Sequence, residues 1–80
     1  MFWWWKMTIS EYYDNWYNWR NTDIKDLNVT MDEYIILDNY MEYVYNLIVE
    51  LISTGYIKNE NIENIVPDMI KLEFKKINTK

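Results

Sequence analysis

The chain of 80 residues contains no cysteine and no histidine. The absence of cysteine excludes disulfides and thiolate nucleophiles, and the absence of both excludes zinc sites built on these residues. Without histidine there is no imidazole to act as a general base near neutral pH. Acids one helical turn apart, such as Asp38 and Glu42, are more typical of a solvated helix face than of catalysis. We therefore expect no enzyme activity, no metal and no cofactor.

Glycine and proline occur only once each. A single glycine cannot form a glycine-rich phosphate loop. Neither residue interrupts residues 30–54, where apolar side chains recur at alternating spacings of three and four. That spacing places them on one face of a helix. The members of this stripe are Tyr34, Leu37, Met41, Val44, Ile48 and Leu51.

Both ends of this stretch carry helix signals. Thr30 and Glu33 match a capping box, in which each side chain accepts a hydrogen bond from the backbone of the other residue. Gly55 suits the left-handed position just beyond a helix. We predict one long central helix over about residues 31–54. Additional apolar residues widen its stripe, so this helix must be covered on several sides by the chain or by a partner.

Two shorter helices are predicted on either side of the central one. Thr8 and Glu11 form a second capping box before a helix near residues 9–20. Pro67 suits the first turn of a helix near residues 67–78. Residues 70–75 also alternate between apolar and charged, which is an edge-strand pattern. The predicted fold is mostly α, a single small helical domain over residues 1–80; the alternative is an α+β fold with the N-terminal and C-terminal segments paired as strands.

The net charge of −5 is unevenly distributed. Residues 21–55 hold seven acids against one lysine, which opposes binding to nucleic-acid phosphates and is compatible with a basic protein surface. Acids also interrupt the apolar run of the long helix, which argues against a membrane span. Residues 1–7 lack the features of a secretory signal. We expect a cytoplasmic protein, located in the host cytoplasm if a phage encodes it.

Half of the residues are hydrophobic and 19% are aromatic, which is more apolar bulk than a small core readily encloses. Three consecutive tryptophans cannot all point inward. Because tryptophan is enriched at binding hot spots, the excess predicts an interface. The candidate partner-binding residues are Trp3, Trp4, Trp5, Tyr13, Tyr17, Asp38, Tyr40, Glu42, Tyr43, Tyr45 and Glu50.

These features predict a non-enzymatic, acidic protein-binding module. It would act as an inhibitor or regulator that covers a basic surface of a larger protein, with aromatic anchors for affinity and acids for steering. Small acidic proteins of unusual composition are often phage or mobile-element inhibitors of host defence enzymes that handle nucleic acids, as anti-CRISPR proteins are. Two alternatives stay open: a homodimer that pairs its surplus aromatics, and an aromatic platform that stacks sugars or single-stranded nucleic acid.

Overall fold

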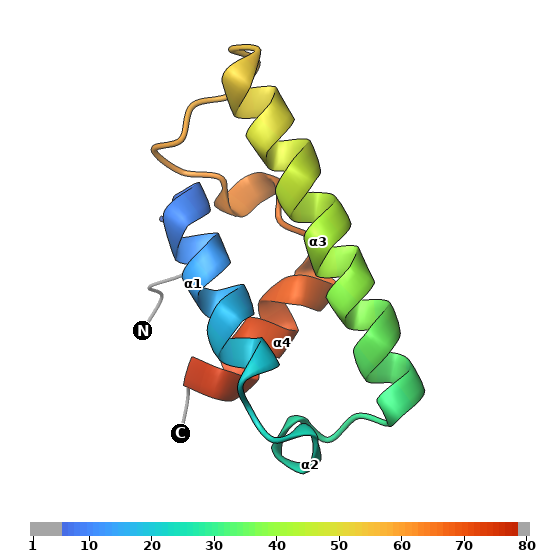
Figure 1. The fold of residues 1–80 in the computed structure, drawn as a ribbon. Helices are drawn as coiled ribbons and strands as arrows, with labels where there is room; N and C mark the ends of the chain where they lie inside the picture. The colour runs from blue at the N-terminus through green and yellow to red at the C-terminus, as the bar shows by residue number, and fades with distance from the viewer. Residues whose placement is uncertain (1–5, 79–80) are drawn as a thin grey trace.

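The computed structural model describes residues 6–78, which form a helical domain without strands over that range. Its elements in chain order are α1 (Ile9–Arg20), α2 (Ile24–Leu27), α3 (Met31–Ser53), the 3-10 helix η2 (Glu63–Ile65) and α4 (Asp68–Asn78). The long helix α3 runs the length of the molecule, α1 lies beside it, and α4 crosses on the far side in the view of Figure 1. The extents of 39 × 28 × 18 Å reflect the length of α3.

The ends of α3 follow the predicted helix signals. The Thr30 hydroxyl accepts a hydrogen bond from the Glu33 amide at 3.1 Å, and Glu33 accepts one from the Thr30 amide at 2.8 Å. After the helix, Gly55 adopts a φ of 82°, a left-handed conformation that glycine takes without steric cost. The prediction of one long central helix is confirmed.

Helix α1 begins with the second capping box. The Thr8 amide donates to Glu11 at 2.8 Å, and the Glu11 amide donates to the Thr8 hydroxyl at 3.2 Å. The face of α1 that turns inward buries Tyr12, Trp16 and Trp19. The predicted helix near residues 9–20 is therefore confirmed, and its aromatic stripe is a core face.

The C-terminal segment is a helix, so the alternative with a C-terminal strand is wrong. Ile70 and Phe74 are fully buried, and Ile77 packs against the core beside them. The helical period of these three residues explains why the segment is a helix, because it places all three against the core on one face. Leu72, which does not fit that period, is 60% exposed.

The core forms where α1, α3 and α4 meet. Tyr12 is fully buried there, with its ring in a T-shaped contact with Phe74 of α4 and its hydroxyl donating to the carbonyl of Met41 in α3 at 2.7 Å. Met7 is also buried, and its backbone exchanges hydrogen bonds with residues 61 and 62 of the segment before η2. Over residues 6–78, no helix is long and apolar enough to span a bilayer.

Candidate functional site

The predicted partner-binding residues fall into several locations. Trp3, Trp4 and Trp5 lie outside the described residues. Of the others, Tyr13 and Tyr17 lie on α1, and the rest lie on different sides of α3. The structure therefore does not gather them into one surface.

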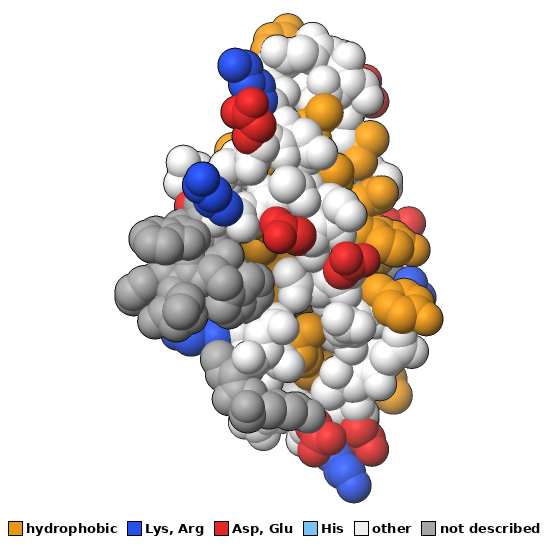
Figure 2. Space-filling view, turned by 90° about the vertical axis from the view of Figure 1, so that its left-hand side faces the viewer, with side chains coloured by type: hydrophobic (Ala, Val, Ile, Leu, Met, Phe, Trp, Pro, Cys, Tyr) orange, Lys and Arg blue, Asp and Glu red, His pale blue; other side chains and the backbone are white. Residues whose placement is uncertain are grey.

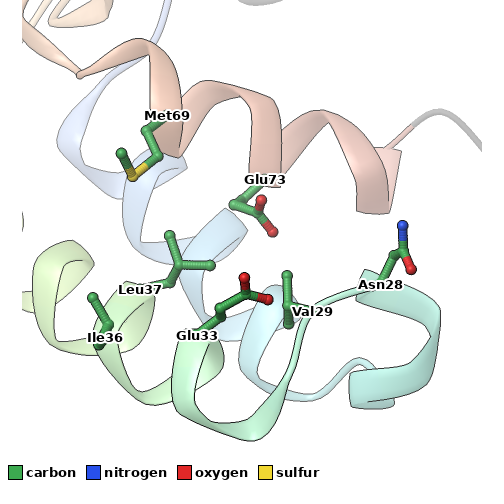
Figure 3. A pocket seen from close by; sticks show the side chains of 7 residues that line it. All are labelled: Asn28, Val29, Glu33, Ile36, Leu37, Met69 and Glu73. Carbon is green, nitrogen blue, oxygen red and sulfur yellow. The ribbon is translucent and has the colours of Figure 1, made fainter.

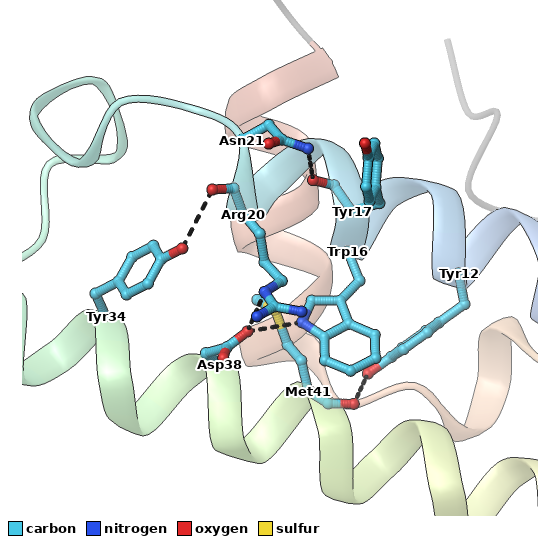
Figure 4. Close-up of polar contacts among 8 residues, drawn as sticks. All are labelled: Tyr12, Trp16, Tyr17, Arg20, Asn21, Tyr34, Asp38 and Met41. Carbon is cyan, nitrogen blue, oxygen red and sulfur yellow. Dashed lines mark hydrogen bonds and ion pairs between the residues drawn. The ribbon is translucent and has the colours of Figure 1, made fainter.

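Asp38 takes part in contacts within the chain. Its Oδ1 accepts a hydrogen bond from Nε1 of Trp16 at 2.9 Å and lies 3.3 Å from Nε of Arg20 (Figure 4). The Arg20 guanidinium also lies over the Trp16 ring, 5.6 Å from its centroid. Asp38 thus joins α3 to α1, a role that its sequence position alone did not indicate.

Three tyrosines form what we call the tyrosine face: Tyr13 and Tyr17 of α1, and Tyr45 of α3. Tyr13 and Tyr17 are exposed, whereas Tyr45 is half-buried. The Tyr45 ring lies 5.6 Å from that of Tyr13 and 5.7 Å from that of Trp16, measured between centroids. The tyrosine face is aromatic but partly used for packing α1 on α3. On the molecule as a whole, Figure 2 shows hydrophobic side chains along one edge, with acidic side chains next to some of them.

A second apolar surface lies on α3 alone. Its four residues, Ile36, Tyr40, Tyr43 and Leu47, follow one another at spacings of four, three and four, which places them on one side of the helix. We call them the α3 seam. The exposed fractions are 68% for Ile36, 64% for Tyr43 and 45% for Leu47, and Tyr40 is half-buried at the base.

The same spacing continues to an acid at each end of the seam. Glu33 precedes Ile36 by three positions, and Glu50 follows Leu47 by three. Both acids are exposed, as is Glu42, which lies on a different side of α3. From Met31 to Ser53, α3 contains five acids and no lysine or arginine. The seam is therefore an apolar strip enclosed between two carboxylates.

An open pocket adjoins the first turns of the seam. It has a volume of about 380 Å³ and lies between the start of α3, the loop before it, and α4 (Figure 3). Its lining residues are Asn28, Val29, Glu33, Ile36, Leu37, Met69 and Glu73. In Figure 3 the side chain of Met69 points from α4 toward α3. Met69 is 57% exposed, so the pocket extends the apolar surface of the seam toward α4.

The buried carboxylate of this pocket is already paired. Glu73 accepts a hydrogen bond from Nε1 of Trp19 at 3.2 Å, and its second oxygen lies 2.9 Å from Nζ of Lys76. These contacts make Glu73 a structural residue at the pocket wall. Glu33 keeps one oxygen in the capping box, and its exposed carboxylate faces the pocket mouth.

The groups with perturbed pKa values also have structural explanations. Burial raises the pKa of Tyr12 well above its ordinary value of 10.0, and the nearby Tyr40 raises it further. A hydrogen bond to Glu63 raises the pKa of Lys71, against the opposing effect of burial. Within residues 6–78, no three acids lie close enough to hold a metal ion. The two groups with perturbed pKa values thus belong to the core packing and to an ion pair of the fold.

Sequence reasoning missed Ile36, Leu47 and Met69 as surface residues. Ile36 and Leu47 could have been found from the sequence. The alternating spacing of three and four that defines the buried stripe of α3 recurs at positions 33, 36, 40, 43, 47 and 50. Met69 could be placed only once the position of α4 was known. Comparison of the chain with protein-family models, with curated proteins and with solved structures finds no match.

Proposed function

We propose that this protein is a non-enzymatic binding module that covers a basic surface of a larger protein and thereby inhibits or regulates it. The main support for this proposal is the composition of the outer side of α3. There, an apolar strip in which Ile36, Tyr43 and Leu47 are exposed lies between Glu33 and Glu50, and α3 contains no basic residue to neutralise these acids. Such a surface supplies apolar anchors for affinity and negative charge for steering a basic partner.

The narrower form of the proposal is an inhibitor encoded by a phage or a mobile element and directed at a host defence enzyme, as anti-CRISPR proteins are. Enzymes that handle nucleic acids need basic grooves for phosphates. An acidic module with apolar anchors can occupy such a groove or the surface beside it. The support for this form is the charge and the composition of the chain alone.

The test is affinity capture from the source cell with the full chain as bait. We expect one protein to be retained in stoichiometric amount and released as the salt concentration rises, since exposed charge pairs are screened. The purified partner should then bind the chain in a titration and lose its own activity.

Two variants make the capture specific. Tyr43→Gln removes an exposed ring from the α3 seam, and Tyr17→Gln removes one from the tyrosine face. Retention that is sensitive to at least one of them supports the proposal. If no protein is retained above the level seen with an unrelated acidic bait, or if both variants retain the same protein equally well, the chain does not act through these surfaces.

A further inference from the structure

We infer that the α3 seam and the adjoining pocket bind an amphipathic helix of the partner protein that has basic residues at both ends of its apolar stripe. This inference rests on the proposed function and specifies the partner's secondary structure and charge. The seam accepts a helix because its residues repeat at the spacing by which two helices interlock their side chains. Its apolar part, Ile36 to Leu47, spans roughly three helical turns.

The charge at the ends of the seam selects the occupant. Glu33 and Glu50 lie at seam positions, roughly 25 Å apart along the helix axis at the rise of an α-helix. A docked helix of similar length would bring its own residues close to both carboxylates. Lysine or arginine at those two places would be attracted, whereas acids would be repelled.

The α3 helix of a second copy would not place lysine or arginine opposite Glu33 and Glu50. The seam is symmetric about its midpoint, so an antiparallel pair of α3 helices would place Glu33 of one copy beside Glu50 of the other, at both ends. A parallel pair would place each glutamate beside its equivalent. Because α3 has no lysine or arginine, neither arrangement offers a countercharge from the helix itself. The observed charges thus favour a different, basic partner.

The pocket gives the docked helix a further contact. Met69 of α4 and Ile36 of α3 line one end of it, with Leu37 between them in the view of Figure 3, and Val29 of the loop lies farther along. A flexible methionine side chain adapts to the shape of what it contacts. One large apolar side chain of the partner helix can enter at this end. The site would therefore hold the helix along the seam and anchor it at the α4 side.

The experiment titrates the full chain into a fluorescently labelled peptide of about 18 residues, long enough to span the seam at the rise of an α-helix. Its leucines follow the spacing of the seam, and lysines occupy the positions opposite the two glutamates. Because the seam has an acid at each end, this peptide fits in either direction. One comparison peptide scrambles the same composition, and another replaces the terminal lysines with glutamates.

We expect the matched peptide to bind at least about tenfold more tightly than either comparison peptide, since only it satisfies spacing and charge together. The double variant Glu33→Gln/Glu50→Gln should weaken binding about fivefold, and a glutamine side chain in place of Glu33 can still serve the capping box. Tyr43→Gln should weaken it about tenfold or more. Asp14→Asn, which removes an exposed acid from α1, should leave binding within about twofold of wild type.

The inference would be overturned by equal binding of the scrambled peptide, by equal binding of the glutamate-ended peptide, or by a doubling of the chain's mass in light scattering that Tyr43→Gln reverses. The last would show that a second copy occupies the seam. If the peptide fails but capture of a partner protein depends on Tyr17, the tyrosine face is the docking surface. In that case the inference fails and the proposed function remains.

Discussion

Nε1 of Trp19 donates a hydrogen bond of 3.2 Å to Oε1 of Glu73, which joins α1 to α4 across 54 positions of sequence. The indole is fully buried, and Glu73 is 7% exposed. The other carboxylate oxygen pairs with Lys76, whose Nζ also donates to the carbonyl of Leu27 at 2.8 Å. One carboxylate therefore connects α1, α4 and, through a lysine, the end of α2.

Replacing Glu73 should destabilise the fold in a graded way. Glu73→Ala leaves the buried indole N–H without an acceptor and should lower the free energy of unfolding by about 3 kcal/mol. Glu73→Gln keeps one acceptor oxygen for the indole but replaces the other with an NH2 group that cannot pair with Lys76, so about 1 kcal/mol is expected. Urea denaturation followed by circular dichroism measures both. A loss below about 0.5 kcal/mol in Glu73→Ala would contradict this role of the carboxylate, since that is the range of ordinary surface substitutions.

Tyr12 should make the fold sensitive to alkaline pH. Burial raises the pKa of its phenol above the ordinary 10.0, so the unfolded chain loses this proton at a lower pH than the folded chain does. The stabilising contribution is complete below pH 10.0 and falls as the pH rises toward the folded-state pKa. The expected slope is about 1.4 kcal/mol per pH unit.

Tyr12→Phe isolates that contribution. At pH 7 it should cost about 1 kcal/mol, because it removes the hydrogen bond to the carbonyl of Met41. Above pH 10.0 the difference between wild type and variant should shrink and then reverse. Denaturation curves at a series of pH values test this, and parallel pH profiles for the two proteins would contradict it.

The two capping boxes should each support a helix. Thr30→Ala and Thr8→Ala remove the hydroxyl acceptor of the third helical amide, and each should lower the free energy of unfolding by about 1 kcal/mol. Ser10→Ala is the matched control, since Ser10 is an exposed position in the first turn of α1. Thermal unfolding of the three variants measures the effect. Losses in the threonine variants no larger than in the serine control would count against the capping role.

Lys71 should hold η2 against α4. Its Nζ lies 2.8 Å from Glu63 and 3.5 Å from Asp68, and the hydrogen bond to Glu63 raises its pKa. Lys71→Met should cost about 1 kcal/mol in stability, and the loss should shrink in high salt. Lys58→Met makes the same charge change at an exposed site and should have little effect. Equal losses of unfolding free energy in the two variants would show that this ion pair does not stabilise the fold.

The helices were predictable because their signals are local. Thr8, Thr30 and Gly55 mark helix ends through bonds or conformations within a few residues, and the spacing of Leu37 and Met41 reveals a buried stripe without tertiary information. The C-terminal segment left two possibilities open, since periods of two and of 3.6 both fitted part of it. Burial of Ile70 and Phe74 on one face decided in favour of the helix.

The candidate surface was less predictable because it depends on which helix covers which side of α3. Asp38 reads as a free acid in the sequence, yet Trp16 and Arg20 of α1 reach it in space. In the sequence, Ile36 belongs to a helix that has apolar residues on several sides. In the structure, α1 packs on another side of α3, and Ile36 stays exposed. Contacts between residues far apart in sequence determine both outcomes.

We infer that the α3 seam binds another molecule and contributes little to the stability of this fold. The most direct measurement is the free energy of unfolding of the double variant Tyr43→Gln/Leu47→Gln, with the buried substitution Ile48→Ala beside it. The double variant should stay within about 1 kcal/mol of wild type, as exposed positions do, while Ile48→Ala loses about 3 kcal/mol. A loss in the double variant as large as that of Ile48→Ala would show that the seam belongs to the core and is not a free binding surface.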